Sequence, residues 1–200
     1  MLSAIIFDIG NVLLPFDFGT AIRRVADQVR VQPSEIFNRL LPLKDHYETG
    51  KIPRAEFVSG AIKLIGFEGE EKEFVDAWLD IFTPNEPLHN LVGKLADRYP
   101  LYLLSNTSDL HMDFIVENYP VFSLFRDGVY SHIAGCMKPD PAIYQHTIEK
   151  LGVAPEKTLF IDDLEPNITA AREFGFQTFH YDHTRHEDLE HELREKYGIS

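Results

Sequence analysis

Polar side chains follow four of the short apolar runs in the sequence. The residues concerned are Asp8, Ser105, Asn106, Lys138, Asp162 and Asp163. A carboxylate nucleophile, a hydroxyl donor and a cation are what phosphoryl transfer requires, because that chemistry depends on positioning and on neutralising negative charge. Several aspartates at one point would repel one another unless a hard cation lay between them, and Mg²⁺ is the natural candidate. These residue types therefore predict a magnesium-dependent site for a small phosphorylated metabolite.

Asp8 by itself allows two interpretations. It follows the apolar run at residues 4–7, and strands commonly end at polar residues that form turns. Ligand sites in open α/β sheets, however, lie beyond the carboxyl ends of the strands, which is where Asp8 would stand. The rest of the chain has to decide between a turn former and a functional carboxylate.

Alternating apolar runs and amphipathic stretches predict the elements that must position these side chains. We expect strands at 4–7, 101–105, 128–133, 158–162 and 177–181, and helices at 107–120, 139–151, 164–174 and 185–197. Strands that alternate with helices form a parallel sheet with helices on both faces, so the predicted fold class is α/β. In such a sheet the polar residues that follow the strands would converge at one edge.

Residues 8–100 show no further strand and predict successive helices at 19–30, 33–42, 53–65 and 70–82. This segment is too long for a single crossover connection. We therefore predict a helical insertion of residues 16–88, with residues 1–15 and 89–200 forming the catalytic core. An insertion at the carboxyl edge of the sheet would cover Asp8 and could exclude water from the site.

Composition excludes several classes of function. The 200-residue chain is 44% hydrophobic and carries 19 Lys plus Arg against 32 Asp plus Glu, a net charge of -13, so we expect no nucleic-acid partner. Its apolar runs are shorter than the roughly 20 residues that span a bilayer, so no membrane span is expected. One cysteine and no signal-peptide pattern at the N-terminus predict a cytoplasmic protein. The sequence does not indicate an oligomeric state.

The order of the four motifs resembles that of the haloacid dehalogenase-like hydrolase superfamily. The segments are "FDIGNVLL", "LLSNTS", "CMKPDPAIY" and "LFIDDLEPNITAAREFG". Each motif alone is weak, whereas all four in this order, with a helical insertion, are specific. The resemblance spans nearly the whole chain and implies a Rossmann-like parallel sheet sandwiched by helices, with an inserted four-helix cap domain.

The resemblance also implies the residues that react and bind metal. Asp8 would be the nucleophile that forms an aspartyl-phosphate. Asp8, the backbone carbonyl of Gly10 and Asp163 would be the magnesium ligands. Hydrolysis of a phosphomonoester is the activity that this arrangement implies.

The remaining site residues would hold phosphate or orient their neighbours. By the same resemblance Ser105 and the backbone N–H of Asn106 would bind phosphoryl oxygens, and Lys138 would neutralise them and orient Asp8. Asp162 would lie beside Lys138. Asn167 either orients a metal ligand or stabilises its helix, and we favour the first interpretation.

Gly10 departs from the usual phosphatase pattern of the superfamily, which has a second aspartate there as general acid and base. General acid catalysis is typically worth 10²–10⁴-fold, so its loss restricts the leaving groups that can be expelled. A good leaving group, such as an anomeric sugar oxygen, would tolerate this loss. Alternatively, a water molecule or Asp17 could supply the proton. The start "FDIGNV" and the segment "HYETGKI" most resemble bacterial α-D-glucose-1-phosphate phosphatases, so a hexose 1-phosphate is the predicted kind of substrate.

Two alternatives stay open. A metal-free 2-haloacid dehalogenase of the same superfamily also lacks the second aspartate, and Arg23 or Arg24 could hold the substrate carboxylate. The acidic pair Asp162 and Asp163 would be superfluous in such a site. A binding or regulatory member that has lost catalysis is the other alternative, although the nucleophile, the serine, the lysine and the metal carboxylate are all present. Magnesium-dependent turnover of a phosphomonoester would separate the three hypotheses.

Overall fold

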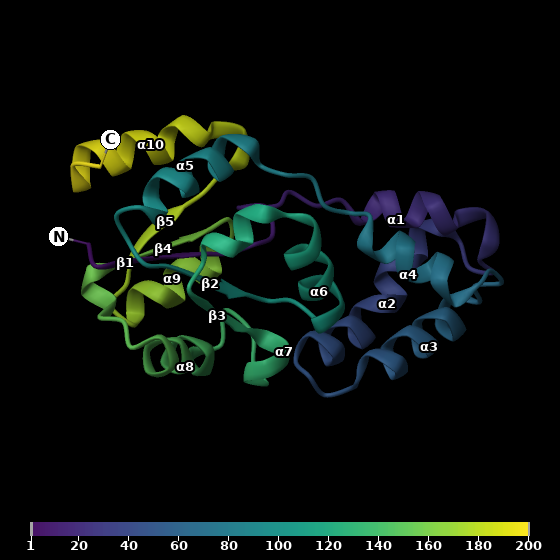
Figure 1. The fold of residues 1–200 in the computed structure, drawn as a ribbon. Helices are drawn as coiled ribbons and strands as arrows, with labels where there is room; N and C mark the ends of the chain where they lie inside the picture. Colours follow the sequence, from purple (N-terminus) through teal and green to yellow (C-terminus); the bar gives the residue numbers. More distant parts are fainter. Residues whose placement is uncertain (1, 200) are drawn as a thin grey trace.

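Residues 2–199 are described by a computed structural model, in which five parallel strands form one sheet in the order β3-β2-β1-β4-β5 (Figure 1). The strands are β1 (Ala4–Phe7), β2 (Leu101–Ser105), β3 (Asp127–Tyr130), β4 (Thr158–Asp162) and β5 (Gln177–His180). β1 lies at the centre, paired with β2 on one side and β4 on the other. The register places the residues after β1, β2 and β4 at one edge of the sheet. The parallel sheet with its connecting helices confirms the predicted α/β class.

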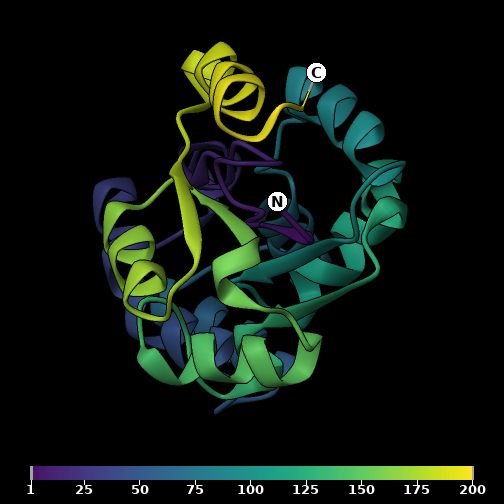
Figure 2. The same cartoon turned by 90° about the vertical axis from the view of Figure 1, so that its left-hand side faces the viewer.

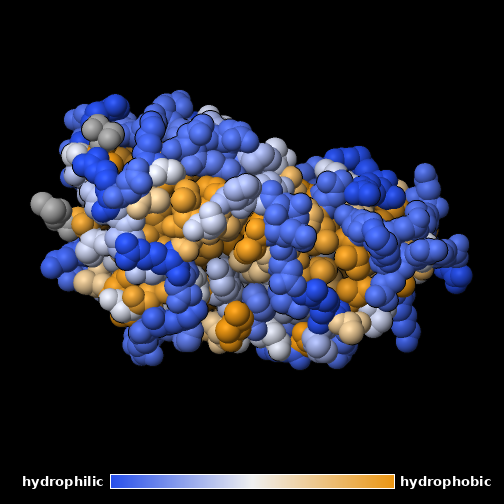
Figure 3. All heavy atoms as spheres, viewed as in Figure 1, coloured by the Kyte–Doolittle hydropathy of each residue, from blue (hydrophilic) through white to orange (hydrophobic). Residues whose placement is uncertain are grey.

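Alternate strand residues face two separate apolar clusters, one on each face of the sheet. Ile5 and Phe7 pack with one set of helices, and Ile6 packs with the other. The first set is α5 (Glu86–Ala96), α6 (Asp109–Asn118) and α10 (His186–Tyr197); the second is α8 (Pro141–Leu151) and α9 (Glu165–Glu173) (Figure 2). The outer surface of α10 is hydrophilic (Figure 3) because Leu189 and Leu193 point into the first cluster.

The insertion has its own apolar cluster and lies beyond the carboxyl ends of the strands (Figure 1). Its helices are α1 (Phe18–Val25), α2 (Pro33–Glu48), α3 (Arg54–Ile65) and α4 (Glu71–Leu79). Phe57 and Trp78 lie at the centre of this cluster, with their ring centroids 5.1 Å apart. The division at residues 15/16 and 88/89 stays a prediction, and Leu88 packs with the cluster of the sheet.

Three differences from the predicted elements affect the surroundings of the cavity. Residues 131–133, predicted as strand, begin the short helix α7 (Ser131–Ala134), where the Ser131 hydroxyl bonds the backbone of Thr107. α5 was not predicted; Asn85 caps it by accepting a hydrogen bond from Leu88 N. No helix within residues 2–199 is both long enough and apolar enough to cross a bilayer.

The third difference is the end of α2, which was expected at residue 42 and lies at Glu48. Proline has no N–H to donate and usually breaks a helix interior. Here Ile36, Leu40 and Tyr47 are all buried in the cluster of the insertion, and their helical spacing continues across Pro42. The extra turns bring Lys44 and Glu48 to the wall of the cavity described below.

Candidate active site

A cavity of about 290 Å³ lies between the carboxyl edge of the sheet and the insertion. The predicted residues that line it are Asp8, Gly10, Ser105, Asn106, Lys138, Asp163 and Asn167. They come from segments up to 159 positions apart and meet because the strands that precede them are parallel and in register. The cavity is near the lower size limit of small-molecule sites, so a small metabolite would fit.

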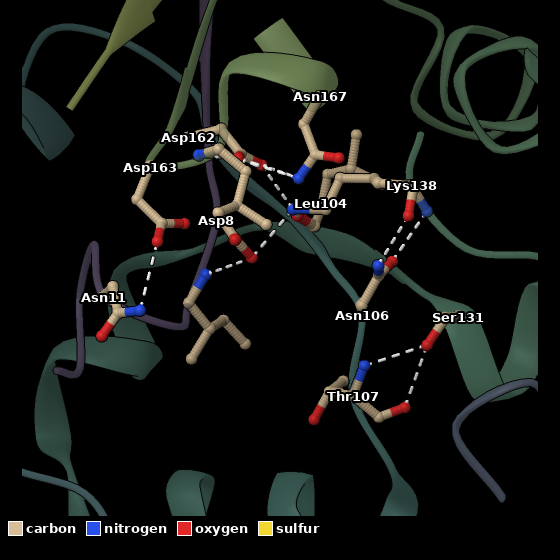
Figure 4. Close-up of polar contacts among 12 residues, drawn as sticks. Asp8, Asn11, Leu104, Asn106, Thr107, Ser131, Lys138, Asp162, Asp163 and Asn167 are labelled. Atoms are coloured by element: carbon tan, nitrogen blue, oxygen red, sulfur yellow. Dashed lines mark hydrogen bonds and ion pairs between the residues drawn. The ribbon is translucent and has the colours of Figure 1, made fainter. Parts of the chain in front are cut away.

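Lys138 is buried and its ammonium group is held from three sides (Figure 4). Its Nζ donates to the Leu104 carbonyl at 2.9 Å and to Asp162 Oδ2 at 2.6 Å, and lies 3.0 Å from Asp8 Oδ1. An ammonium group has three donors, so each finds an acceptor. Lys138 is therefore fixed beside the carboxylate of Asp8.

The side chain of Asn106 positions the backbone of Lys138, a contact that the sequence did not reveal. Asn106 Nδ2 donates to the Lys138 carbonyl at 2.9 Å, and the Lys138 N–H donates to Asn106 Oδ1 at 2.8 Å. Ser131 adds a second link between the same loops, through the hydroxyl bonds to Thr107 noted above (Figure 4). Two side chains thus lock the loop after β2 to the loops that follow β3.

Asp162 is fully buried and its oxygens are engaged within the protein. Oδ1 accepts from Leu164 N and Asn167 Nδ2, both at 2.9 Å, while Oδ2 accepts from Lys138. Asn167 therefore orients Asp162 and, through it, Lys138. We expected Asn167 to orient a metal ligand; its side chain contacts Asp162 rather than the predicted ligand Asp163.

Asp163 is held by Asn11, which adopts a positive φ of 52°. Asn11 Nδ2 donates to Asp163 Oδ2 at 3.1 Å, which leaves the other oxygen of Asp163 for a ligand. Asparagine is among the few non-glycine residues that tolerate this backbone region. The turn after β1 thereby joins the turn after β4, and this contact was also missed from the sequence.

Ligand atoms of Asp8, Asp162 and Asp163 lie within 4.8 Å of one another, which is compatible with a shared cation. Because Asp162 is engaged by Lys138 and Asn167, the oxygen donors that face the cavity are those of Asp8 and Asp163. The carbonyl of Gly10 can join them, since the bridge between Gly10 and Leu14 uses the neighbouring Ile9 carbonyl and Asn11 N–H. Hard oxygen donors of this kind fit Mg²⁺.

Burial raises the pKa of Asp8 to about 7, against a usual 3.8. Lys138 acts in the opposite direction, whereas Asp162 and Asp163 raise the pKa further. A cation between the carboxylates would favour the charged form of Asp8, which is the form that can attack an electrophile. The electrostatics of the site thus favour binding of a cation.

Gly10 has no room for a side chain while Phe16 keeps its place. A Cβ built on Gly10 would lie 2.8 Å from Cε1 of the Phe16 ring, closer than real Cβ contacts. The ring of Phe16 lines the cavity beside Asp8. The Phe16 ring therefore occupies the space that an acidic side chain at position 10 would need.

Asp17 does not take the place of that acid, contrary to the alternative considered from the sequence. It caps α1 by accepting from Gly19 N at 2.7 Å and pairs with Arg23 at 3.1 Å, on the protein surface. The hydrogen bond from Arg23 lowers the pKa of Asp17, so the group holds its negative charge rather than a proton. Within the described chain it is not part of the cavity wall.

The insertion contributes charged residues to the cavity that the sequence analysis did not identify. Lys44, Asp45 and Glu48 of α2 line it, and Lys44 Nζ donates to Glu48 Oε2 at 2.6 Å. His111 of α6 lines the same cavity and bonds the Trp78 carbonyl of the insertion at 3.2 Å. The segment "HYETGKI" contained Glu48, but only the length of α2 shows where that side chain lies.

Comparison with known proteins agrees with this geometry. A D-ribitol-5-phosphate phosphatase from Bacteroides thetaiotaomicron is 31% identical over 193 residues, covering 90% of this chain and 91% of the relative. A haloacid dehalogenase (HAD) family enzyme from the same organism, solved with magnesium and inorganic phosphate, is 30% identical, with a TM-score of 0.81 and coverage of 90% and 93%. An (S)-2-haloacid dehalogenase from a Pseudomonas species is 28% identical over 121 residues, 60% of this chain and 53% of that protein.

The family model for haloacid dehalogenase-like hydrolases matches residues 2–175, which include all four motifs and the insertion. The chain belongs to the haloacid dehalogenase-like hydrolase family.

Proposed function

We propose that this hydrolase is a magnesium-dependent phosphomonoesterase that forms an aspartyl-phosphate at Asp8 and acts on a small sugar or polyol phosphate, such as a hexose 1-phosphate. The observation that carries the proposal is the position of Lys138, held by Asp162 and Leu104 against Asp8 in a cavity that also contains Asp163. The relative that acts on D-ribitol 5-phosphate supports a polyhydroxylated substrate. We expect the enzyme to act in the cytosol.

In the proposed reaction Asp8 attacks phosphorus and the Lys138 ammonium offsets charge on the phosphoryl oxygens. Asp8 Oδ1 accepts from Ile9 N at 2.7 Å and faces Lys138, which leaves Oδ2 as the attacking atom. Ser105, buried at the end of β2, and the Asn106 N–H would bind the phosphoryl oxygens. Mg²⁺, held by Asp8, the Gly10 carbonyl and Asp163, would supply further positive charge against the phosphate.

The dehalogenase alternative is less compatible with the positions of the arginines. Arg23 pairs with Asp17 and Arg24 pairs with Asp80, both on the surface, and neither is among the described residues of the cavity wall. The site contains Asp163, which a metal-free reaction does not need. A bare acidic pair is costly unless a cation or hydrogen bonds compensate for it.

The proposal is tested by screening phosphorylated metabolites with the full chain, in Mg²⁺ and again in excess EDTA. We expect release of phosphate from sugar or polyol phosphates, with at least 100-fold less in EDTA. 2-Haloacids, assayed for halide release, serve as the comparison substrates. Halide release that persists in EDTA, without phosphatase activity, would contradict the proposal.

A further inference from the structure

We propose that Glu48, on the last turn of α2, gives its proton to the leaving oxygen in place of the side chain that Gly10 lacks. The inference rests on the proposed phosphatase function. It depends on three features of the cavity: the space beside Gly10, the state of the other proton carriers in its wall, and the burial of the Lys44–Glu48 pair.

The loop after β1 cannot supply the proton. Position 10 has no side chain, and Phe16 occupies the space that one would need. Phe18 packs edge-on against Phe16 with ring centroids 5.5 Å apart, so this side of the cavity is an apolar wall. A group that protonates the leaving oxygen must come from another wall.

His111 is buried in the cavity wall but has no proton to give. Burial lowers its pKa to about 4, so the ring is neutral at pH 7. Its Nε2 faces the Trp78 carbonyl at 3.2 Å, which requires the single ring proton to be on Nε2. Nδ1 is then an acceptor, and His111 can bind a hydroxyl group of a substrate without acting as an acid.

The other charged groups in the wall are also committed or exposed. The donors of Lys138 are bound to Asp8, Asp162 and the Leu104 carbonyl. Asp45 is exposed at the mouth of the cavity. Among the described residues of the wall, Glu48 is the buried acid that the insertion contributes.

The Lys44–Glu48 pair has little reason to be buried for stability alone. The Glu48 side chain is 8% exposed and that of Lys44 is 17% exposed. Removing two charges from water often outweighs their attraction, and a pair of apolar residues at the same positions would be at least as stable. Burial also raises the pKa of Glu48, and Lys44 opposes this shift.

The size of the cavity suits a substrate that reaches from Asp8 to α2. A sphere of 290 Å³ is about 8 Å across, similar to a small phosphorylated sugar. With the phosphate at Asp8 and Lys138, the ester oxygen and the organic group would extend toward the insertion. The leaving oxygen would then be directed to the wall that contains Glu48.

Each step of the proposed reaction balances. Asp8 Oδ2 forms a bond to phosphorus while the bond from phosphorus to the leaving oxygen breaks, and the Glu48 proton moves to that oxygen. The alcohol departs and Glu48 is left as a carboxylate, stabilised by Lys44. In the second step the Glu48 carboxylate takes a proton from water, the resulting hydroxyl attacks phosphorus, and inorganic phosphate and the Asp8 carboxylate are released.

The test compares single-turnover rates of the wild type and Glu48→Gln on phosphomonoesters of similar size and graded leaving-group pKa. We expect the wild type to depend weakly on leaving-group pKa. Glu48→Gln should lose 100- to 1,000-fold with alkyl phosphates but less than about threefold with p-nitrophenyl phosphate, whose leaving group needs no proton. Glu48→Asp should recover part of the alkyl phosphatase rate, and Glu35→Gln, on the exposed surface of α2, is the matched control.

The outcomes separate this inference from the proposed function. If Glu48→Gln lost activity equally on every leaving group, Glu48 would have a structural role and the inference would be wrong, while the phosphatase function would stand. If Glu48→Gln failed to fold, a steep leaving-group dependence of the wild type would overturn the inference and a flat one would support it. A wild type without phosphatase activity would overturn the proposed function itself.

Discussion

Two lysines line the cavity, Lys138 next to the sheet and Lys44 on the insertion, and they are held in different ways. Lys138 contacts Leu104, Asp162 and Asp8, which lie in or directly after three different strands. Lys44 pairs with Glu48, four residues further along the same helix. The first arrangement exists only when the sheet is assembled, whereas the second is internal to α2.

This difference indicates which part of the site is fixed and which part can vary. The sheet fixes the positions of Asp8 and Asp162 relative to each other, because β1 and β4 are paired in register. The pair on α2 lines the cavity because the insertion docks on α6. The docking contacts are the salt bridges from Arg54 to Asp109 and Asp113, the Tyr47–Asp109 hydrogen bond and the His111–Trp78 hydrogen bond.

The largest effect is expected on the sheet side, from Asp8→Asn. An amide of nearly the same shape cannot attack phosphorus, so kcat on p-nitrophenyl phosphate should fall by more than about 1,000-fold. Binding of inorganic phosphate, measured by calorimetry, should persist because Ser105 and Lys138 stay in place. Turnover close to that of the wild type would show that Asp8 is not the nucleophile.

Lys138→Met removes the cation that pairs with Asp8 and Asp162 on the sheet side of the cavity. It leaves Asp8 and Asp162 buried without a cation, and breaking a buried ion pair in this way lowers the free energy of unfolding by about 3–5 kcal/mol. Urea unfolding measures this change. Lys138→Met combined with Asp162→Asn should recover part of the stability but none of the activity. A stability loss below about 1 kcal/mol would mean that the three contacts of Lys138 are not coupled.

Asp163→Ala tests the metal site at the edge of the sheet. Removing a direct carboxylate ligand should raise the Mg²⁺ concentration for half-maximal activity by about 100-fold. Asp162→Ala is the informative comparison, because Asp162 is bound to Lys138 and Asn167 and should affect kcat more than the Mg²⁺ requirement. The reverse result would make Asp162, and not Asp163, the ligand.

The contact of His111 with the insertion can be tested through the pH dependence of protein stability. Its pKa is about 4 in the folded protein and 6.5 when unperturbed, so the unfolded chain binds the extra proton first as pH falls. Its contribution to stability is complete above pH 6.5 and is lost toward pH 4. Between pH 6.5 and 5 the wild type should lose about 2 kcal/mol more than His111→Gln, which keeps a donor for the Trp78 carbonyl. Equal slopes in urea unfolding would contradict this assignment.

The smallest effect is expected at the docking surface, from Arg54→Met. Arg54 is partly exposed and bridges Asp109 and Asp113, and exposed ion pairs contribute about 0.2–1 kcal/mol each. Stability should fall by no more than about 1 kcal/mol, and KM should rise more than kcat falls because the insertion docks less often. A large fall in kcat with unchanged KM would place the effect on the sheet side instead.

Several features followed from the sequence because they depend on local patterns. Short apolar runs marked the strands, and the polar residue after each run marked the edge where Asp8, Lys138 and Asp163 meet. The absence of an acid at Gly10 was also readable. The end of α2 could not be predicted, since Pro42 is a strong local stop signal and the helix continues past it with Tyr47 buried in the apolar cluster of the insertion.

Tertiary structure alone decided the contacts between segments that are distant in the chain. Asn106 holds the backbone of Lys138, and Asn11 holds Asp163, although nothing in their local sequence requires either contact. Phe16 fills the space beside Gly10 because the loop after β1 folds back over it. Local spacing determines which residues share a strand end or a helix face, but the meeting of two faces is set by strand register and helix packing across the whole chain.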